Sequence, residues 1–291
     1  MLERTPLFAE SGNIAWRNRS VASLLEDRGT PFIILKNSFR YWAADPFIFN
    51  YNGDLYIFAE LYDYITRKGV IGYCKWNGVR FGRWKKVIEE DYHLSYPYIF
   101  EHDGDVYVMP ESGAKGDLHL YRAVAFPDKW EASTILRENV IFGDTTPFIW
   151  KQHTYALTYD VSDSEEYKLM LLDLQNSEND CAVQVGDPEL RRPAGKHFLY
   201  SGMHIRPAQN CRGDYGKGLL FYQYSVVHGL FSEKCIDMIS PQDLHYSRRI
   251  VLDGLHTYNA TESFEVIDIK TRRLNLLNLA SRIVGKLRRS L

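Results

Sequence analysis

An internal repeat of about fifty residues is the feature that most constrains the fold. Residues 45–60 read DPFIFNYNGDLYIFAE, and residues 96–111 read YPYIFEHDGDVYVMPE, an ungapped match. In both segments an apolar run meets an Asn-Gly or Asp-Gly turn, and a second aromatic-rich run follows. This pattern is typical of a β-hairpin with a tight type I′ turn. The repeating unit is therefore built on a hairpin.

Further copies of the hairpin extend the repeat along the chain. A third copy, TPFIWKQHTYALTYD, occupies residues 146–160, and its acidic residue falls one place later relative to the tyrosine. A fourth is placed at residues 204–225 and a fifth at residues 256–268. Units of about fifty residues with alternating apolar positions fit four-stranded propeller blades. We therefore predict one all-β domain, a five-bladed β-propeller, over residues 1–268.

Two points of this architecture stay open at the level of sequence. A β-sandwich whose hairpins resemble each other by chance is the alternative fold. Residues 1–35 either complete the last blade or form a cap over the propeller.

Composition and charge narrow the functional classes. With 45% hydrophobic and 25% charged residues, the chain has the composition of an ordinary globular protein. Its 35 basic and 37 acidic residues give a net charge of −2, so we expect no nucleic-acid partner. The first twenty residues lack the apolar core of a signal peptide, and the four cysteines form no CxxC pair. We expect a cytoplasmic location with reduced thiols.

The propeller fold predicts where a functional site lies. The innermost strand of each blade lines the central channel, so residues near its start converge from several blades on one funnel. Carboxylates crowded in a partly dry funnel have raised pKa values, which suits acid–base chemistry on a sugar. The candidates from the first three repeats are Asp45, Glu60, Glu111, Asp144 and Asp160, and those from the last two are His204, Arg206, Gln209, Arg212, Tyr215 and His256. Each of these could instead have only a structural role.

Several segments carry a resemblance to a known family. These are ADPFIF…GDLYIFAE, YPYIFEHDGDVYVMPES, RRPAG, RPAQNCRGDYGKG and HTYN. They resemble the family whose type member is the N-terminal domain of glucosamine inositolphosphorylceramide transferase, which is itself similar to the five-bladed propellers of furanosidases and fructosidases. The resemblance implies a carbohydrate-active protein, often linked to surface-glycan synthesis. By similarity to those hydrolases, Asp45 would be the base or nucleophile, and Glu111 or Asp144 would be further carboxylates of the funnel.

The fourth repeat departs from the hydrolase pattern. Those hydrolases usually present an acidic proton donor there, whereas this sequence presents His204, Arg206 and Gln209. A phosphate leaving group needs a fixed positive charge, which arginine supplies. We therefore predict a glycosyltransferase of cell-surface polysaccharide or glycolipid synthesis, in which Arg206 and Arg212 neutralise the phosphate of an activated sugar donor and the acceptor is a glycan or is lipid-linked.

Two rival functions remain. One is a furanosidase-like glycoside hydrolase, and the other is a noncatalytic propeller that binds glycans. No HExxH or paired Cys/His motif is present, and GDYGKG at 213–218 does not match GxGxxG. We therefore predict no metal and no cofactor.

The last residues differ from the repeats. Residues 270–291 contain seven basic residues and no acid, and their leucines recur at helical spacing. We predict a basic amphipathic helix over residues 269–291, which would attach the protein peripherally to the inner face of the cytoplasmic membrane. Alternatively the helix packs on the propeller or on a second subunit, which would give a homo-oligomer.

Overall fold

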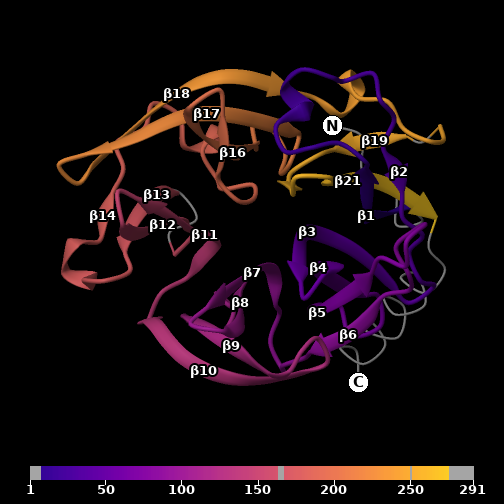
Figure 1. The fold of residues 1–291 in the computed structure, drawn as a ribbon, viewed down its shortest axis with the longest axis horizontal. Helices are drawn as coiled ribbons and strands as arrows, with labels where there is room; N and C mark the ends of the chain where they lie inside the picture. The colour runs from indigo at the N-terminus through magenta and orange to yellow at the C-terminus, as the bar shows by residue number, and fades with distance from the viewer. Residues whose placement is uncertain (1–7, 163–166, 250, 275–291) are drawn as a thin grey trace, which may run out of the picture.

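The computed structural model describes residues 8–162, 167–249 and 251–274 of the chain. Within these ranges, twenty-one strands form five antiparallel sheets arranged in a ring around a central axis (Figure 1). The predicted all-β, five-bladed β-propeller is confirmed. In the same ranges, no helix combines the length and the apolar character that a membrane crossing requires.

The first three blades share one plan, in which four strands run in sequence order from the axis outwards (Figure 1). The strands of the first blade are β3 (Tyr41–Tyr51), β4 (Asp54–Asp63), β5 (Lys68–Lys75) and β6 (Lys85–Ile88). Those of the second are β7 (Ser95–His102), β8 (Asp105–Glu111), β9 (Asp117–Ala125) and β10 (Lys129–Glu138). Those of the third are β11 (Phe142–Trp150), β12 (His153–Asp160), β13 (Lys168–Asp173) and β14 (Cys181–Ala182).

Tight turns join the two innermost strands of each of these blades. Asn52 and Gly53 have φ values of 49° and 81°, and Asp103 and Gly104 have 50° and 84°. Positive φ at both central residues is the mark of the type I′ turn that the Asn-Gly and Asp-Gly pairs predicted. All these turns lie on one face of the propeller, so the starts of the innermost strands lie on the other.

The fourth blade corrects the predicted register of the repeat. Its strands are β15 (Phe198–Tyr200), β16 (Met203–Asn210), β17 (Gly218–Val227) and β18 (Leu230–Ile239). Residues 204–225, predicted as the inner hairpin, are therefore the second and third strands of the blade. The innermost position belongs to the segment that begins at Arg192, whose carbonyl accepts a hydrogen bond from Gln209 N at 2.8 Å.

The error has a simple cause. The fourth blade contains two Arg-Pro pairs, Arg192-Pro193 and Arg206-Pro207. The turn that follows the first pair, Ser201-Gly202, has φ values of 48° and 75° and takes the place of Asn52-Gly53. It carries neither Asn nor Asp, so the sequence signal of the turn is weak. Arg192, rather than Arg206, occupies the position equivalent to Asp45.

The two ends of the described chain close the ring. The fifth sheet contains β1 (Phe8–Arg17), β2 (Ile33–Ile34), β19 (Leu252–Gly254), β20 (Tyr258–Ala260) and β21 (Glu265–Leu274). β1 pairs with β21 along its whole length, from Phe8 opposite Leu274 to Arg17 opposite Glu265. The N-terminal segment therefore completes the last blade, which answers the question that the sequence left open.

The predicted start of the helical tail is wrong. Residues 270–274 belong to β21, because they continue its pairing with β1. Lys270 is buried in this strand, and its ammonium donates to the carbonyl of Tyr215 at 2.5 Å. A basic side chain whose ammonium finds an acceptor in this way is compatible with a strand as well as with a helix. The rest of the predicted helix, residues 275–291, lies outside the described residues.

Candidate active site

A distorted residue at the start of three innermost strands directs side chains to the axis. Asp45, Tyr96 and Asp144 have φ values of 51°, 45° and 51°, and each lies where the register between the first two strands of its blade shifts. This left-handed conformation costs a residue other than glycine about 1–2 kcal/mol. Such bulges commonly re-aim side chains next to active sites. The same strained bulge in three blades therefore marks the channel entrance as a candidate site.

Asp45, His256 and Asp268 form one half of the site. His256 Nδ1 lies 2.7 Å from Asp268 Oδ2 and 3.4 Å from Asp45 Oδ1. Asp268 also accepts hydrogen bonds from the backbone N–H groups of Asp45, His256 and Thr257, at 3.1, 3.0 and 2.9 Å. The Thr257 hydroxyl donates to Asp45 Oδ1 at 2.9 Å. Asp268 thus holds the first and fifth blades together at the axis.

The electrostatics of this half give its members different charges. Burial disfavours the protonated form of His256, but the charge of the Asp268 carboxylate outweighs the effect of burial and raises the pKa of His256 to about 9. Burial raises the pKa of Asp45 to about 6, although the charge of His256 acts in the opposite direction. Near pH 7, His256 is therefore a cation, and Asp45 is an anion that can readily take up a proton. This is the behaviour expected of a general base.

Among the residues that the structure describes, the same three are candidate ligands for a metal. One atom from each of Asp45, His256 and Asp268 lies within 4.8 Å of the others. A metal at His256 Nδ1 would have to displace the proton that this nitrogen shares with Asp268. The three side chains form an ion-paired network, and their atoms are also close enough together to hold a metal ion.

Arg192 organises the other half of the site. Its Nε donates to Asp144 Oδ2 at 2.5 Å, and its Nη2 donates to Glu111 Oε2 at 3.2 Å. Gln209 Nε2 also donates to Asp144 Oδ2, at 2.6 Å. The guanidinium lies 5.2 Å from the centre of the Tyr215 ring, and that ring lies 5.1 Å from the ring of His256. Tyr215 therefore bridges the two halves.

Two glutamates in the site have raised pKa values. Burial raises the pKa of Glu111 to about 8; Arg192 lowers it and Asp144 raises it. Burial, followed by the charges of Asp45 and Glu111, raises the pKa of Glu60 well above its usual range. Glu60 Oε1 lies 3.5 Å from His93 Nε2. At neutral pH Glu111 is mostly protonated and can donate a proton, while Asp45 can accept one. Separated pKa values of this kind are typical of acid–base pairs.

Tyr96 links three blades next to the site. Its side chain is fully buried, its hydroxyl pairs with Thr146 Oγ1 at 2.7 Å, and it accepts from Gly195 N at 2.6 Å.

Asp160 does not join the site. Glu60 pairs with Ala44, and Glu111 pairs with Ser95, but the equivalent pairing in the third blade joins Tyr159 to Gly143. Asp160 is one residue further along the strand, and successive side chains point to opposite faces of a sheet. Its carboxylate accepts instead from Ser162.

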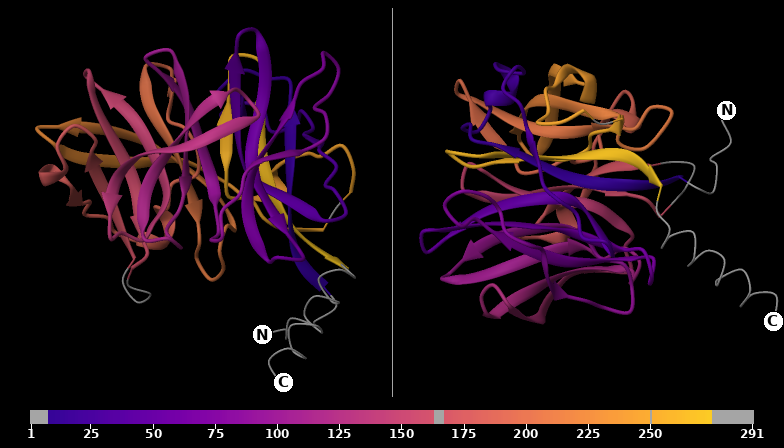
Figure 2. Two further views of the ribbon diagram at one scale, coloured as in Figure 1. Left: turned by 90° about the horizontal axis from the view of Figure 1, so that it is seen from below. Right: turned by 90° about the vertical axis from the view of Figure 1, so that its right-hand side faces the viewer.

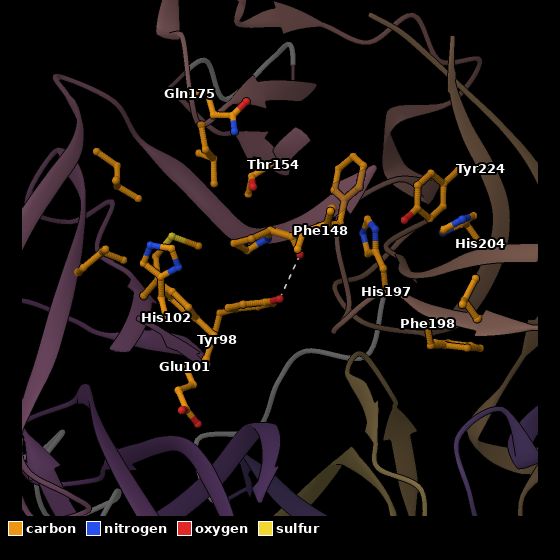
Figure 3. A pocket seen from close by; sticks show the side chains of 18 of the residues that line it. Tyr98, Glu101, His102, Phe148, Thr154, Gln175, His197, Phe198, His204 and Tyr224 are labelled. Atoms are coloured by element: carbon orange, nitrogen blue, oxygen red, sulfur yellow. Dashed lines mark hydrogen bonds between the residues drawn. The ribbon is translucent and has the colours of Figure 1, made fainter. Parts of the chain in front are cut away.

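Three predicted residues of the fourth blade also lie elsewhere. Arg206 is fully buried and bound to Glu233 through two hydrogen bonds, at 2.6 and 2.9 Å. Arg212 is exposed and pairs with Asp187. His204 packs against Trp150 in a separate cavity of about 920 Å³ (Figure 3). This displacement follows from the one-strand shift in the predicted repeat.

The structure thus brings seven of the predicted residues together: Asp45, Glu60, Glu111, Asp144, Gln209, Tyr215 and His256. Arg192, Asp268 and Thr257 belong to the site but were not predicted. Arg192 and Thr257 lie within the RRPAG and HTYN segments that carry the family resemblance. Asp268 has no comparable motif, because only the pairing of β21 brings it to the axis.

Comparison with known proteins places the chain in a family. Residues 35–243 match the family described as glucosamine inositolphosphorylceramide transferase 1, N-terminal. The chain belongs to this family. The match includes most of the site, from Asp45 to Tyr215, and it confirms the resemblance inferred from the motifs.

Two relatives carry the same name. The glucosamine inositolphosphorylceramide transferase 1 of Arabidopsis thaliana is 28% identical over 241 residues, which cover 79% of this chain and 30% of that protein. That of Oryza sativa subsp. indica is 27% identical over 194 residues, which cover 62% and 26%. The chain therefore spans less than a third of the length of these relatives.

A solved structure supports the fold independently. The catalytic domain of an α-L-arabinofuranosidase of glycoside hydrolase family 62 from Coprinopsis cinerea superposes with a TM-score of 0.60 at 10% identity. The superposition covers 88% of this chain and 97% of that domain. At this identity the likeness shows the shared propeller fold alone.

Proposed function

We propose that this propeller is a glycosyltransferase that moves a sugar from a phosphate-activated donor to a glycan or lipid-linked acceptor, in the synthesis of cell-surface polysaccharide or glycolipid. The observation that carries the proposal is Arg192, a cation at the channel entrance between Asp144, Glu111 and Tyr215. A guanidinium has five N–H donors, so donors remain for a ligand after its bonds to the two carboxylates. The transferase names of the relatives support the same reaction class.

In this proposal Arg192 takes the role that the sequence suggested for Arg206 and Arg212. The donor phosphate binds the guanidinium, which stabilises the negative charge that grows on the leaving oxygen. The bond from the anomeric carbon to that oxygen breaks, and its electron pair leaves with the phosphate. The acceptor hydroxyl oxygen bonds to the anomeric carbon, and its proton passes to Asp45. Glu111 and Asp144 hold sugar hydroxyls or assist the proton transfer.

Donor turnover by the purified chain tests this reaction. UDP-glucose, UDP-N-acetylglucosamine and GDP-mannose would be incubated with the protein and a membrane lipid extract, and release of the nucleoside diphosphate would be measured. We expect extract-dependent release, and a loss of about 10³-fold in Asp45→Asn, which removes the base. Normal turnover by a folded Asp45→Asn protein would refute the role of Asp45.

A hydrolase is the second candidate, and the separated pKa values of Asp45 and Glu111 favour it specifically. It would release nitrophenol from 4-nitrophenyl α-L-arabinofuranoside without any nucleotide sugar. A noncatalytic glycan-binding propeller would turn over neither substrate and would keep its glycan affinity in Asp45→Asn.

The proposed location is the inner face of the cytoplasmic membrane. All four cysteines are free thiols, in keeping with a reducing compartment. Residues 275–291 retain four basic residues and no acid, which suits attraction to an anionic membrane surface. Fractionation of cells that express the chain, before and after a high-salt wash, would test this location. Recovery in the soluble fraction at low salt would contradict it.

A further inference from the structure

The direction of β21 fixes the face at which the chain leaves the propeller. β21 contributes Asp268 to the site and then continues through six more residues to Leu274. A strand rises about 3.3 Å per residue, so Leu274 lies roughly 20 Å further along the same direction. Figure 2 shows the yellow end of β21 at one edge of the propeller. β21 therefore ends on the face that carries the starts of the innermost strands, the face of the channel entrance.

Exposed apolar side chains surround this exit. Phe39, Ile65 and Val251 are 77%, 53% and 79% exposed, and we call these three residues the exit rim. Val251 directly precedes Leu252, which pairs with Thr271 of β21. The loop that carries Ile65 lies beside the same part of β21. The hydroxyl of the preceding Tyr64 donates to Oγ of Ser11, which pairs with Thr271.

The two loops of the first blade lie next to each other at this rim. Tyr64 N donates to the carbonyl of Arg40, so Phe39 and Ile65 flank one backbone contact. The exposed charged residues in these loops are the basic Lys36, Arg40 and Arg67, of which Arg40 is ion-paired with the buried Asp63. Glu89 also acts on Arg40, but its carboxylate is paired with Lys86. Apolar tips flanked by basic side chains are typical of surfaces that insert into anionic headgroups.

We propose that the exit rim contacts an anionic lipid bilayer, so that the channel entrance with Asp45 and Arg192 faces the membrane surface. Three separate side chains at loop tips can enter a headgroup layer one by one, whereas a stable protein interface needs about 800 Å² of matched surface on each partner. The orientation rests on the proposed membrane attachment but not on the proposed chemistry. It makes lipid-linked molecules the acceptor class that reaches the site most directly.

A matched pair of variants tests this orientation. The rim variant is Phe39→Glu with Ile65→Glu, and the control is Leu230→Glu, a position that is 74% exposed. Leu230 lies on the opposite face, because β17 starts beside Gln209 at the site and ends at the turn before Leu230. The full chain would be sedimented with vesicles of phosphatidylcholine, with or without phosphatidylserine.

We expect the chain to bind the vesicles that contain phosphatidylserine and to be released by salt. The rim variant should bind about tenfold more weakly, because two charges would enter the headgroup layer, and the control should match the parent chain. Equal binding by the parent and the rim variant, or equal losses in the rim variant and the control, would overturn the orientation. Absence of vesicle binding, with a dimer in light scattering that the rim variant disrupts, would identify the rim as a protein interface instead.

Circular dichroism would first establish that the variants fold. If the double variant does not fold, Val251→Glu replaces it, with the same expected loss. Because vesicle binding is measured without any sugar donor, a failure here is separate from a failure of the proposed reaction.

Discussion

Arg192 and Arg206 lie in neighbouring segments of the same blade, each precedes a proline, and each binds carboxylates, yet their surroundings differ. Arg206 has no exposed side-chain surface, and two parallel hydrogen bonds join it to Glu233 inside the blade. Arg192 is 17% exposed at the channel entrance, where it contacts Asp144, Glu111 and the Tyr215 ring. A charge buried inside a blade can only stabilise the fold, whereas a charge at the channel entrance can bind a ligand.

The two arginines also differ in the neighbours that they influence. Arg192 lowers the pKa of Glu111 and so takes part in the acid–base balance of the site. Arg206 shares Glu233 with Arg191, and both guanidinium groups lie against the Tyr222 ring. The division between a functional and a structural arginine can be tested at each residue separately.

The largest expected effect is on stability and belongs to Arg206. Arg206→Ala leaves Glu233 buried with only Arg191 as a cationic partner, so we expect a loss of about 3 kcal/mol in the free energy of unfolding. Urea denaturation would measure it, and the double variant Arg206→Met with Glu233→Leu should recover only part of the loss, because it leaves Arg191 without its carboxylate partner. A loss below about 1 kcal/mol would argue against a structural role for Arg206.

The next effect is on activity and belongs to Arg192. Arg192→Gln removes the cation from the donor phosphate, so donor turnover should fall by about 10²-fold. Its loss of stability should be smaller than that of Arg206→Ala, because Gln209 still donates to Asp144. Arg212→Gln is the matched control, since Arg212 is exposed and paired with Asp187. Equal turnover by the two variants would contradict the assignment.

A smaller effect concerns the pH profile. In the proposed reaction Asp45 must be ionised to accept the acceptor proton, so turnover should rise through about pH 6. Protonated Glu111 holds a sugar hydroxyl as a hydrogen-bond donor, so turnover should fall as this group ionises through about pH 8. Arg192 lowers the pKa of Glu111, so Arg192→Gln should move the alkaline limb to higher pH. The acid limb should stay in place, because Asp45 owes its pKa to burial, His256 and other carboxylates. An unchanged alkaline limb would show that Arg192 does not influence the pKa of Glu111.

The smallest effect is expected at Asp160. This carboxylate lies one residue beyond the position equivalent to Glu60 and Glu111, and it binds Ser162. Asp160→Ala should leave turnover unchanged and alter the free energy of unfolding by less than about 0.5 kcal/mol. A marked loss of turnover would show that the loop after Asp160 brings this residue back to the site.

The sequence predicted the fold well where turn chemistry is explicit. Asn52-Gly53 and Asp103-Gly104 marked the inner hairpins, and Asp45, Glu111 and Asp144 were placed from them. The prediction failed in the fourth blade, where Ser201-Gly202 gives a weak turn signal and Arg206-Pro207 imitates the start of a repeat. Asp268 could not be predicted, because its place depends on strand pairing between the two ends of the described chain. Lys270 was misplaced because its charge is satisfied by a distant carbonyl.

Diphosphate binding tests the central claim, the assignment of Arg192, most directly. UDP, GDP and inorganic pyrophosphate would be titrated into the parent chain, Arg192→Gln and Arg212→Gln by isothermal calorimetry. We predict that at least one of these anions binds the parent chain, that Arg192→Gln weakens it by about 10²-fold, and that Arg212→Gln does not. Unchanged affinity in a folded Arg192→Gln protein would contradict the account.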